Sequence, residues 1–351
     1  AYEISECLVG SEMCIRDRCA LVCLLVRKKV CKRIIDTSAG DTSTDRVAVI
    51  AKRLIKSCIP VSAAAIVVNL SSFIDLITIP RCLNFALSSD PGYFTACFSD
   101  IIKTQGGAVR LANFMYGSYT GLSWTMFMLI PSFTAMFGRS ALPQIAGAWT
   151  LGNRKEFERK VTVVLRSNFV IGFPLYLGLS AMSRQILEFL FSGRQQEVTV
   201  SATSLFILGL GGVFLTLSST FISIFQVIGR SDLPVKLMLP GCAVKLIFNV
   251  FTISVPAINI NGAAVSTVIM YAAVALGGYF ALENVTGIDF HIIRRMAVPL
   301  SAGIVCAVVS RIVYGFVRES VNAVTALFLP IASGGAVYII LLIIFNEINI
   351  K

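Results

Sequence analysis

Residues 131–166, PSFTAMFGRSALPQIAGAWTLGNRKEFERKVTVVLR, show how the rest of the chain is organised. A first apolar run ends at Gly138-Arg139, where the chain leaves a nonpolar medium. A short loop is expected next, in which Pro143 stops the helix and Leu151–Asn153 make a turn. The charged segment Arg154–Lys160 then opens a second apolar run. This pattern predicts two membrane helices joined by a positively charged surface loop.

The composition indicates that lipid surrounds most of this chain. Of its 351 residues, 56% are hydrophobic and 14% are charged, whereas soluble domains average about 45–50% and about 25%. The formal net charge is +11, but the cations lie between apolar runs, as in the loops of a membrane protein, so no nucleic-acid partner is expected. The ten cysteines and the single histidine, His291, lack metal-ligand spacing, and no metal site is predicted.

Working outward from the charged loop, apolar runs long enough to cross about 30 Å of hydrocarbon predict eight complete membrane helices. The segment Arg81–Gly107 is predicted to be a long loop along the membrane surface, with a turn at Asp90–Gly92. The predicted spans are Ser57–Pro80, Leu111–Phe137, Val161–Met182, Ala202–Val227, Lys236–Val255, Gly262–Leu282, Met296–Phe316 and Val321–Phe345.

Small residues cluster inside several of these spans. The groups are Gly209–Gly212, Gly262–Ala264 and Gly277-Gly278. They are expected to let neighbouring helices pack closely, as small residues do in membranes. The alternative is that they let a helix bend while a transport cavity opens and closes.

The distribution of lysine and arginine orients the predicted spans. Alternate loops divide these residues by roughly three to one, and the richer side of a membrane protein faces the cytoplasm. The richer side holds the linker before Ser57, the loop around Arg154 and the C-terminal Lys351. The sequence therefore predicts a multi-pass inner-membrane protein whose C-terminus is cytoplasmic.

The N-terminal region differs from the rest. Residues 1–18, AYEISECLVGSEMCIRDR, show no signal-peptide pattern. The part CLVGSEMCIRDR resembles a translated sequencing-adapter scar, so this segment is expected to be an artefact that resequencing the locus would expose. Residues 19–26, CALVCLLV, are too short to span a membrane and are expected to be the end of a truncated helix. Residues 27–56 then form a cytoplasmic linker.

Ionisable residues at membrane depth are the candidate site residues, because charges are costly there. Asp75 lies inside the first complete span; it either lines a polar cavity or pairs with Arg81 at the interface. Lys245 and Asn249 are four residues apart and share a helix face. Lys245 either snorkels to the surface or attracts a phosphate in a cavity. Arg110, at the start of the second span, is the fourth candidate.

The chain shows no recognisable catalytic motif. It contains no glycine-rich phosphate loop, no G-x-S-x-G and no H-E-x-x-H sequence. An enzyme is therefore not predicted, and no catalytic residue or cofactor is assigned.

Short motifs in a characteristic order and spacing occur over residues 57–282, and by them the chain resembles the stage V sporulation protein B and polysaccharide-flippase branch of the multidrug/oligosaccharidyl-lipid/polysaccharide (MOP) exporter superfamily. The motifs are Pro60, Ile74-Asp75, Tyr116-Gly117, Pro131, Ser140–Pro143, Gly152–Arg154, Pro174–Gly178, Gln226–Gly229, Val244-Lys245 with Asn249, and Asn261–Ala264.

This resemblance implies an all-α membrane bundle of the MATE/MOP type, in which two six-helix lobes are followed by two more helices. Residues 57–283 would be the C-terminal lobe and residues 284–351 the two added helices, with the N-terminal lobe of the same chain missing. Such proteins move a polyprenyl-linked sugar across the bacterial inner membrane by alternating access. Asp75, Lys245, Asn249 and Arg110 would be this lobe's contribution to the polar cavity.

Two other functions are compatible with the sequence. A drug/cation antiporter of the same superfamily would use a buried carboxylate such as Asp75 to couple transport to H⁺ or Na⁺. A non-transporting partner of a cell-wall assembly complex would share the fold without moving a substrate.

Overall fold

The computed structural model describes residues 47–105, 108–318 and 322–345. By its internal contacts the chain divides into two compact units, Ala1–Lys56 and Ser57–Lys351. The predictions for residues 1–18, for the truncated helix at 19–26 and for the linker up to residue 46 lie outside the described residues. Helix α2 already begins at Val47, so the end of the predicted linker is helical. All contacts given below lie within the second unit.

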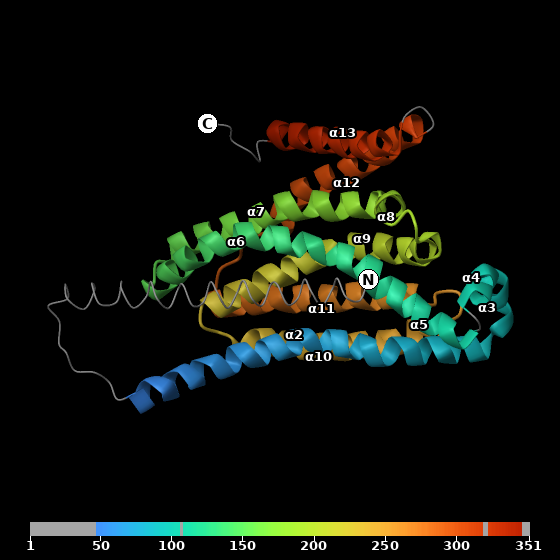
Figure 1. The fold of residues 1–351 in the computed structure, drawn as a ribbon. Coiled ribbons are helices and arrows are strands. Elements are labelled where there is room, and N and C mark those ends of the chain that lie inside the picture. Colours follow the sequence, from blue (N-terminus) through green and yellow to red (C-terminus); the bar gives the residue numbers. More distant parts are fainter. Residues whose placement is uncertain (1–46, 106–107, 319–321, 346–351) are drawn as a thin grey trace. The chain divides into compact units, whose positions relative to one another are not determined.

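Every regular element of the described residues is a helix, which confirms the all-α prediction (Figure 1). The elements are α2 (Val47–Ser89), α3 (Pro91–Cys97), α4 (Ser99–Gln105), α5 (Ala108–Ser118), the π-helix η1 (Tyr119–Trp124), α6 (Thr125–Thr150), α7 (Arg154–Ala181), α8 (Ser183–Leu190), α9 (Gln195–Val227), α10 (Asp232–Ile253), α11 (Asn261–Thr286), α12 (Ile292–Val317) and α13 (Ala323–Ile344).

Helix α9 is at the centre of the second unit. It packs against both α7 and α11, and α6 contacts α7 and α9. Helix α10 packs against the far side of α11, while α12 packs against α7 and carries α13 (Figure 1). Helices α10 and α11 therefore lie on one side of α9, and helices α7, α12 and α13 lie on the other side.

Seven helical segments of the described residues are long and apolar enough to cross a membrane: Asn69–Ser89, Arg154–Ala181, Gln195–Val227, Asp232–Ile253, Asn261–Thr286, Ile292–Val317 and Val324–Ile344. The predicted span Leu111–Phe137 is not among them. The structure builds that stretch from three consecutive helical segments, α5, η1 and α6. Because these three segments follow one another without a break, the stretch Leu111–Phe137 is helical throughout, as predicted for a span.

The long loop predicted over Arg81–Gly107 is wrong. Helix α2 continues through Pro80 to Ser89, and the short helices α3 and α4 follow. Asp90 does not simply turn the chain, because its carboxylate caps α3 by accepting a hydrogen bond of 3.0 Å from the backbone N–H of Tyr93. The chain thus stays helical here, since free backbone groups are costly near lipid.

The loop predicted after Phe137 is also too long. Helix α6 runs through Pro143 and ends only at Thr150, so this proline does not end the helix as predicted. The turn itself is confirmed at Leu151–Asn153. Gly152 has a φ of +67°, and Asn153 caps α7 by accepting a hydrogen bond of 3.2 Å from the backbone N–H of Glu156.

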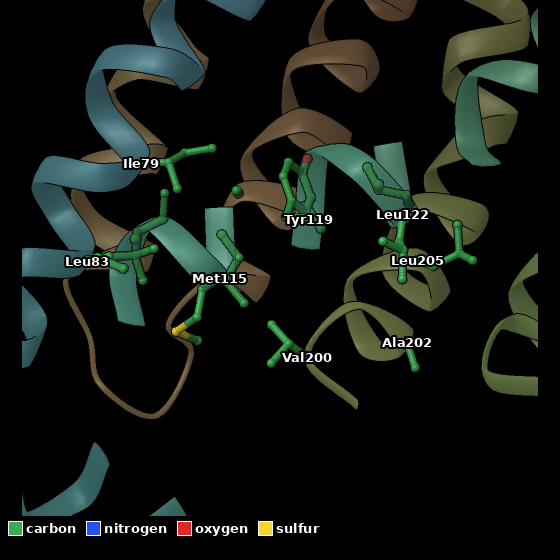
Figure 2. Close-up of a cluster of buried hydrophobic side chains, with 14 of the residues drawn as sticks. Ile79, Leu83, Met115, Tyr119, Leu122, Val200, Ala202 and Leu205 are labelled. Atoms are coloured by element: carbon green, nitrogen blue, oxygen red, sulfur yellow. The ribbon is translucent and has the colours of Figure 1, made fainter. Parts of the chain in front are cut away.

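Apolar side chains fill the contacts between helices and also cover the outer faces. One buried cluster joins the second half of α2, α5, η1 and the first half of α9 (Figure 2). A second joins α6, α7, α9 and α11. Large apolar side chains such as Phe73 and Phe251 are 60% and 70% exposed. Exposed apolar faces of this kind are expected where helices meet lipid.

Close helix packing at the glycine groups is confirmed. A Cβ atom on Gly211 would lie 2.2 Å from Val268 of α11, and one on Gly212 would lie 2.1 Å from the ring of Tyr176 in α7. Helix α9 can therefore approach both neighbours only because these two positions lack side chains.

Candidate functional site

Two polar helix faces meet inside the second unit. Ser71, Asp75 and Thr78 lie on one face of α2, because residues four and seven apart are stacked along a helix. Lys245 and Asn249 lie on one face of α10 for the same reason. The two faces are joined by hydrogen bonds between residues about 170 positions apart in the chain.

The ammonium of Lys245 is enclosed completely. Its Nζ atom lies 2.6 Å from Oδ2 of Asp75 and donates a hydrogen bond of 2.9 Å to the hydroxyl of Ser71. It also lies 5.7 Å from the ring centre of Trp124, at the end of η1, where the ring's π-face attracts a cation. The side chain of Lys245 is 0% exposed and that of Asp75 is 8% exposed.

Asn249 binds the second carboxylate oxygen of Asp75. Its Nδ2 atom donates hydrogen bonds of 3.0 Å to Oδ1 of Asp75 and 3.0 Å to the hydroxyl of Thr78. Its Oδ1 atom accepts a hydrogen bond from Ser266 of α11. We refer to Ser71, Asp75, Thr78, Lys245, Asn249 and Ser266 as the ionic cluster.

The ionic cluster carries no net charge, and its Asp75–Lys245 pair has hydrogen-bond partners on both sides. These are the conditions under which a buried ion pair can be retained, because attraction at short distance and further hydrogen bonds offset the loss of water. Removing one partner of such a pair costs about 3–5 kcal/mol, since the other charge is left buried alone. The cluster therefore ties α2 to α10 and α11.

The structure brings together three of the four predicted site residues. Asp75 pairs with Lys245 and not with Arg81, which was the alternative partner. Lys245 does not reach the surface, which excludes snorkelling. Arg110 is exposed in the first turn of α5 and makes no contact with the ionic cluster.

Sequence reasoning missed three hydroxyl groups of the cluster, those of Ser71, Thr78 and Ser266. The spacing of Ser71 and Thr78 around Asp75 was a usable signal, because a polar face on an apolar helix needs a partner. Ser266 belongs to another helix, and nothing in its neighbourhood in the sequence indicates the contact with Asn249.

In this conformation the ionic cluster is closed. Asp75, Lys245 and Asn249 line neither of two well-formed cavities of the second unit, of about 520 and 550 Å³. The hydrogen bonds of the cluster can hold α2, α10 and α11 together, or they can be exchanged for others when these helices move. As it stands, the ammonium of Lys245 is enclosed and two of its hydrogen bonds go to Asp75 and Ser71.

Comparison with known proteins agrees with this architecture. Residues 108–333 match the family model described as "Lipid II flippase MurJ", a family of the MOP exporter superfamily. The chain is 23% identical over 243 residues to the lipid II flippase MurJ of Bacillus subtilis, covering 67% of this chain and 44% of that protein. It is 28% identical over 153 residues to an uncharacterized membrane protein of Methanocaldococcus jannaschii, covering 44% of this chain and 29% of that protein.

A solved structure of a lipid II flippase MurJ in an inward closed conformation has the same fold. The TM-score is 0.52 with 18% sequence identity, over 67% of this chain and 50% of that chain. The chain thus spans about half of the length of these flippases.

Proposed function

This chain belongs to the lipid II flippase MurJ family, and from that membership we propose that it takes part in moving a lipid-linked cell-wall precursor across the bacterial inner membrane. A hydrophilic headgroup cannot cross hydrocarbon without polar partners that replace its water. The family consists of lipid flippases, not enzymes, and this chain is a multi-pass membrane protein. The observation that carries the proposal is the buried ionic cluster, because charge at membrane depth is retained where function needs it.

The mechanism that we propose is alternating access with a second lobe of similar size. The flippases that the chain matches are about twice as long as the stretch that they share with it. Alternating access requires two bodies that rock against each other. The second unit would be one such body, with α12 and α13 packed against its α7 side.

In this mechanism the ionic cluster is a switchable tie between α2 and α10. In the conformation described here, Asp75 and Ser71 hold the ammonium of Lys245. When α2 moves, Lys245 would be released toward the anionic part of the headgroup, while Asn249 continues to hold Asp75. Such an exchange of partners is one way in which a packed interface has two stable states.

A drug/cation antiporter is the less favoured alternative. Both carboxylate oxygens of Asp75 already accept hydrogen bonds, and the charge is balanced by Lys245. A coupling H⁺ or Na⁺ at Asp75 would have to displace that ammonium first. A coupling ion, if the flippase uses one, would therefore bind elsewhere.

Two branches of the superfamily are candidates for this chain, the lipid II flippases and the polysaccharide flippases. They differ in the sugar that their lipid substrate carries. We favour the peptidoglycan precursor over a polysaccharide or sporulation-specific substrate, because the matching family model describes a lipid II flippase. Measuring the transport rates of the two lipids with the same preparation of protein would decide between them.

The test is a charge-pair series in vesicles that contain the protein. Lys245→Met leaves Asp75 unpaired, Asp75→Asn leaves Lys245 unpaired, and the double variant removes both charges at similar volume. Flipping is measured as the rate at which a labelled lipid-linked precursor becomes accessible to a membrane-impermeant reagent. We expect all three variants to flip at less than about one tenth of the normal rate, while the double variant regains normal stability.

The double variant separates the two roles of the pair. If it is stable and flips at the normal rate, the pair is only structural and the exchange of partners is refuted. If it is stable and inactive, the charges themselves are required for transport.

A further inference from the structure

One cavity of the second unit lies apart from the ionic cluster. Its volume is about 550 Å³, and its walls come mainly from α6, α7 and α9, with Met238 of α10 and Tyr271 of α11. Among the described residues that line it, none carries a formal charge. Its polar lining is instead made of hydroxyl and amide groups, chiefly Ser132, Thr134, Asn168, Ser219, Thr220 and Ser223.

The protons of these hydroxyl groups are already used. Each serine or threonine donates to a backbone carbonyl of its own helix: Thr220 to Thr216 at 2.7 Å, Ser223 to Ser219 at 2.9 Å and Ser219 to Thr216 at 3.0 Å. Ser132 and Thr134 donate in the same way within α6. What these groups can still offer the cavity is lone pairs, because a hydroxyl has one proton and two acceptor sites.

Asn168 adds an acceptor that lies just beneath the cavity wall. Its side chain is buried, with 8% exposed, and its Nδ2 atom donates a hydrogen bond of 2.8 Å to Thr220. The amide orientation follows from the network, because the Thr220 proton is engaged with Thr216 and only Nδ2 can donate to that oxygen. The Oδ1 atom of Asn168 then has no hydrogen-bond partner, and a buried carbonyl without a partner is costly.

We propose that this cavity binds a neutral sugar ring that carries hydroxyl and N–H donors. Its lining presents acceptors almost throughout, with the phenol of Tyr271 able to donate as well, so it suits a ligand rich in donors and not an anion. The volume lies within the range of about 300–1,000 Å³ that is typical of small-molecule sites, and is far larger than one monovalent cation needs. The absence of charge in the lining matches a neutral ligand.

This inference rests on the proposed function in one respect: the sugar would belong to the headgroup of the lipid-linked precursor. Under that mechanism the cavity would bind the neutral sugar of the headgroup, while Lys245 of the ionic cluster would bind the anionic part of the headgroup. Sugar binding can nevertheless be measured without any flipping, so the two proposals fail separately.

The experiment measures binding of N-acetylglucosamine to the purified full chain in lipid nanodiscs, by saturation-transfer difference NMR. We expect saturable binding in the millimolar range. Asn168→Leu, which removes the unpartnered acceptor, should weaken binding at least 10-fold. Ser219→Leu, which fills the cavity from a partly exposed position, should abolish it. Ser201→Ala is the control: that hydroxyl is buried on the same helix but donates to Ser118 outside the cavity, and binding should be unchanged.

Inorganic phosphate and sodium chloride are the comparison probes. Neither should compete with N-acetylglucosamine, because phosphate needs donors and the cavity offers acceptors. Any of three results would overturn the proposal: no saturable sugar binding, equal binding by the wild type and both cavity variants, or competition by phosphate or Na⁺. The two variants change the cavity at different positions. If one of them fails to fold, the other still tests the proposal.

Discussion

At the scale of single residues, the pair Asp75–Lys245 was partly visible in the sequence. Each residue stands alone in an apolar span, and unpaired charge at membrane depth is costly enough to mark both as candidates. That they find each other could not be predicted, because nothing local indicates which face of α2 meets which face of α10. Arg110 shows the opposite case, since a cation at the start of a helix can reach the surface and needs no partner.

Removing one member of the pair should lower stability as well as transport. Lys245→Met should lower the free energy of unfolding by about 3–5 kcal/mol, because the Asp75 carboxylate is then buried without its counter-ion. Thermal unfolding of the purified protein in detergent measures this loss. Arg110→Met, which removes an exposed cation from α5, should change stability by no more than about 0.5 kcal/mol. Equal effects of the two substitutions would contradict the assignment of Lys245 to a buried pair.

At the scale of helices, the apolar runs predict the spans, but the helix boundaries predicted at prolines are wrong. The sequence predicts helix ends at Pro80 and Pro143, whereas α2 and α6 continue through them. The breaking effect of proline is weaker within membranes, because neighbouring groups satisfy the freed carbonyl. The π-helix η1 had no sequence signal that we could use, although it positions Trp124 over Lys245.

Packing of α9 against α7 should depend on Gly212. In Gly212→Ala the new methyl group would lie 2.1 Å from the Tyr176 ring, and this buried ring would have to move. Overpacking of this kind costs about 1–3 kcal/mol, which thermal unfolding would show as a lower transition temperature.

The matched control for that substitution is Gly178→Ala in α7. A Cβ atom there meets nothing within 4 Å, so the transition temperature should stay the same or rise slightly, because alanine favours helix. A loss of stability at Gly178 as large as at Gly212 would show that close packing is not the cause.

At the scale of the whole molecule, the class of protein followed from composition, and the helix order followed from the spacing of apolar runs. The arrangement of α7, α9 and α11 could not be predicted. These helices have similar compositions, and no pattern in a single sequence indicates which of them pack together. The orientation in the membrane stays a prediction from the charge of the loops.

That orientation can be measured with reporter fusions. A green fluorescent protein fused after Lys351 should fluoresce, because it folds only on the cytoplasmic side, and alkaline phosphatase inserted at Gly193 between α8 and α9 should be active outside. These results follow from the excess of lysine and arginine on the C-terminal side. The opposite pair of signals would invert the orientation of every helix.

The most direct test of the proposed function is flipping by the protein expressed from its complete genomic reading frame. The protein is reconstituted into vesicles, and the rate at which a labelled lipid II analogue crosses the bilayer is compared with that of a labelled phosphatidylglycerol in the same vesicles. We predict that lipid II crosses at least about ten times faster than in protein-free vesicles, while the rate for phosphatidylglycerol does not change. A folded, membrane-inserted protein that accelerates neither lipid, or both equally, would contradict the assignment of this chain to a lipid-linked precursor flippase.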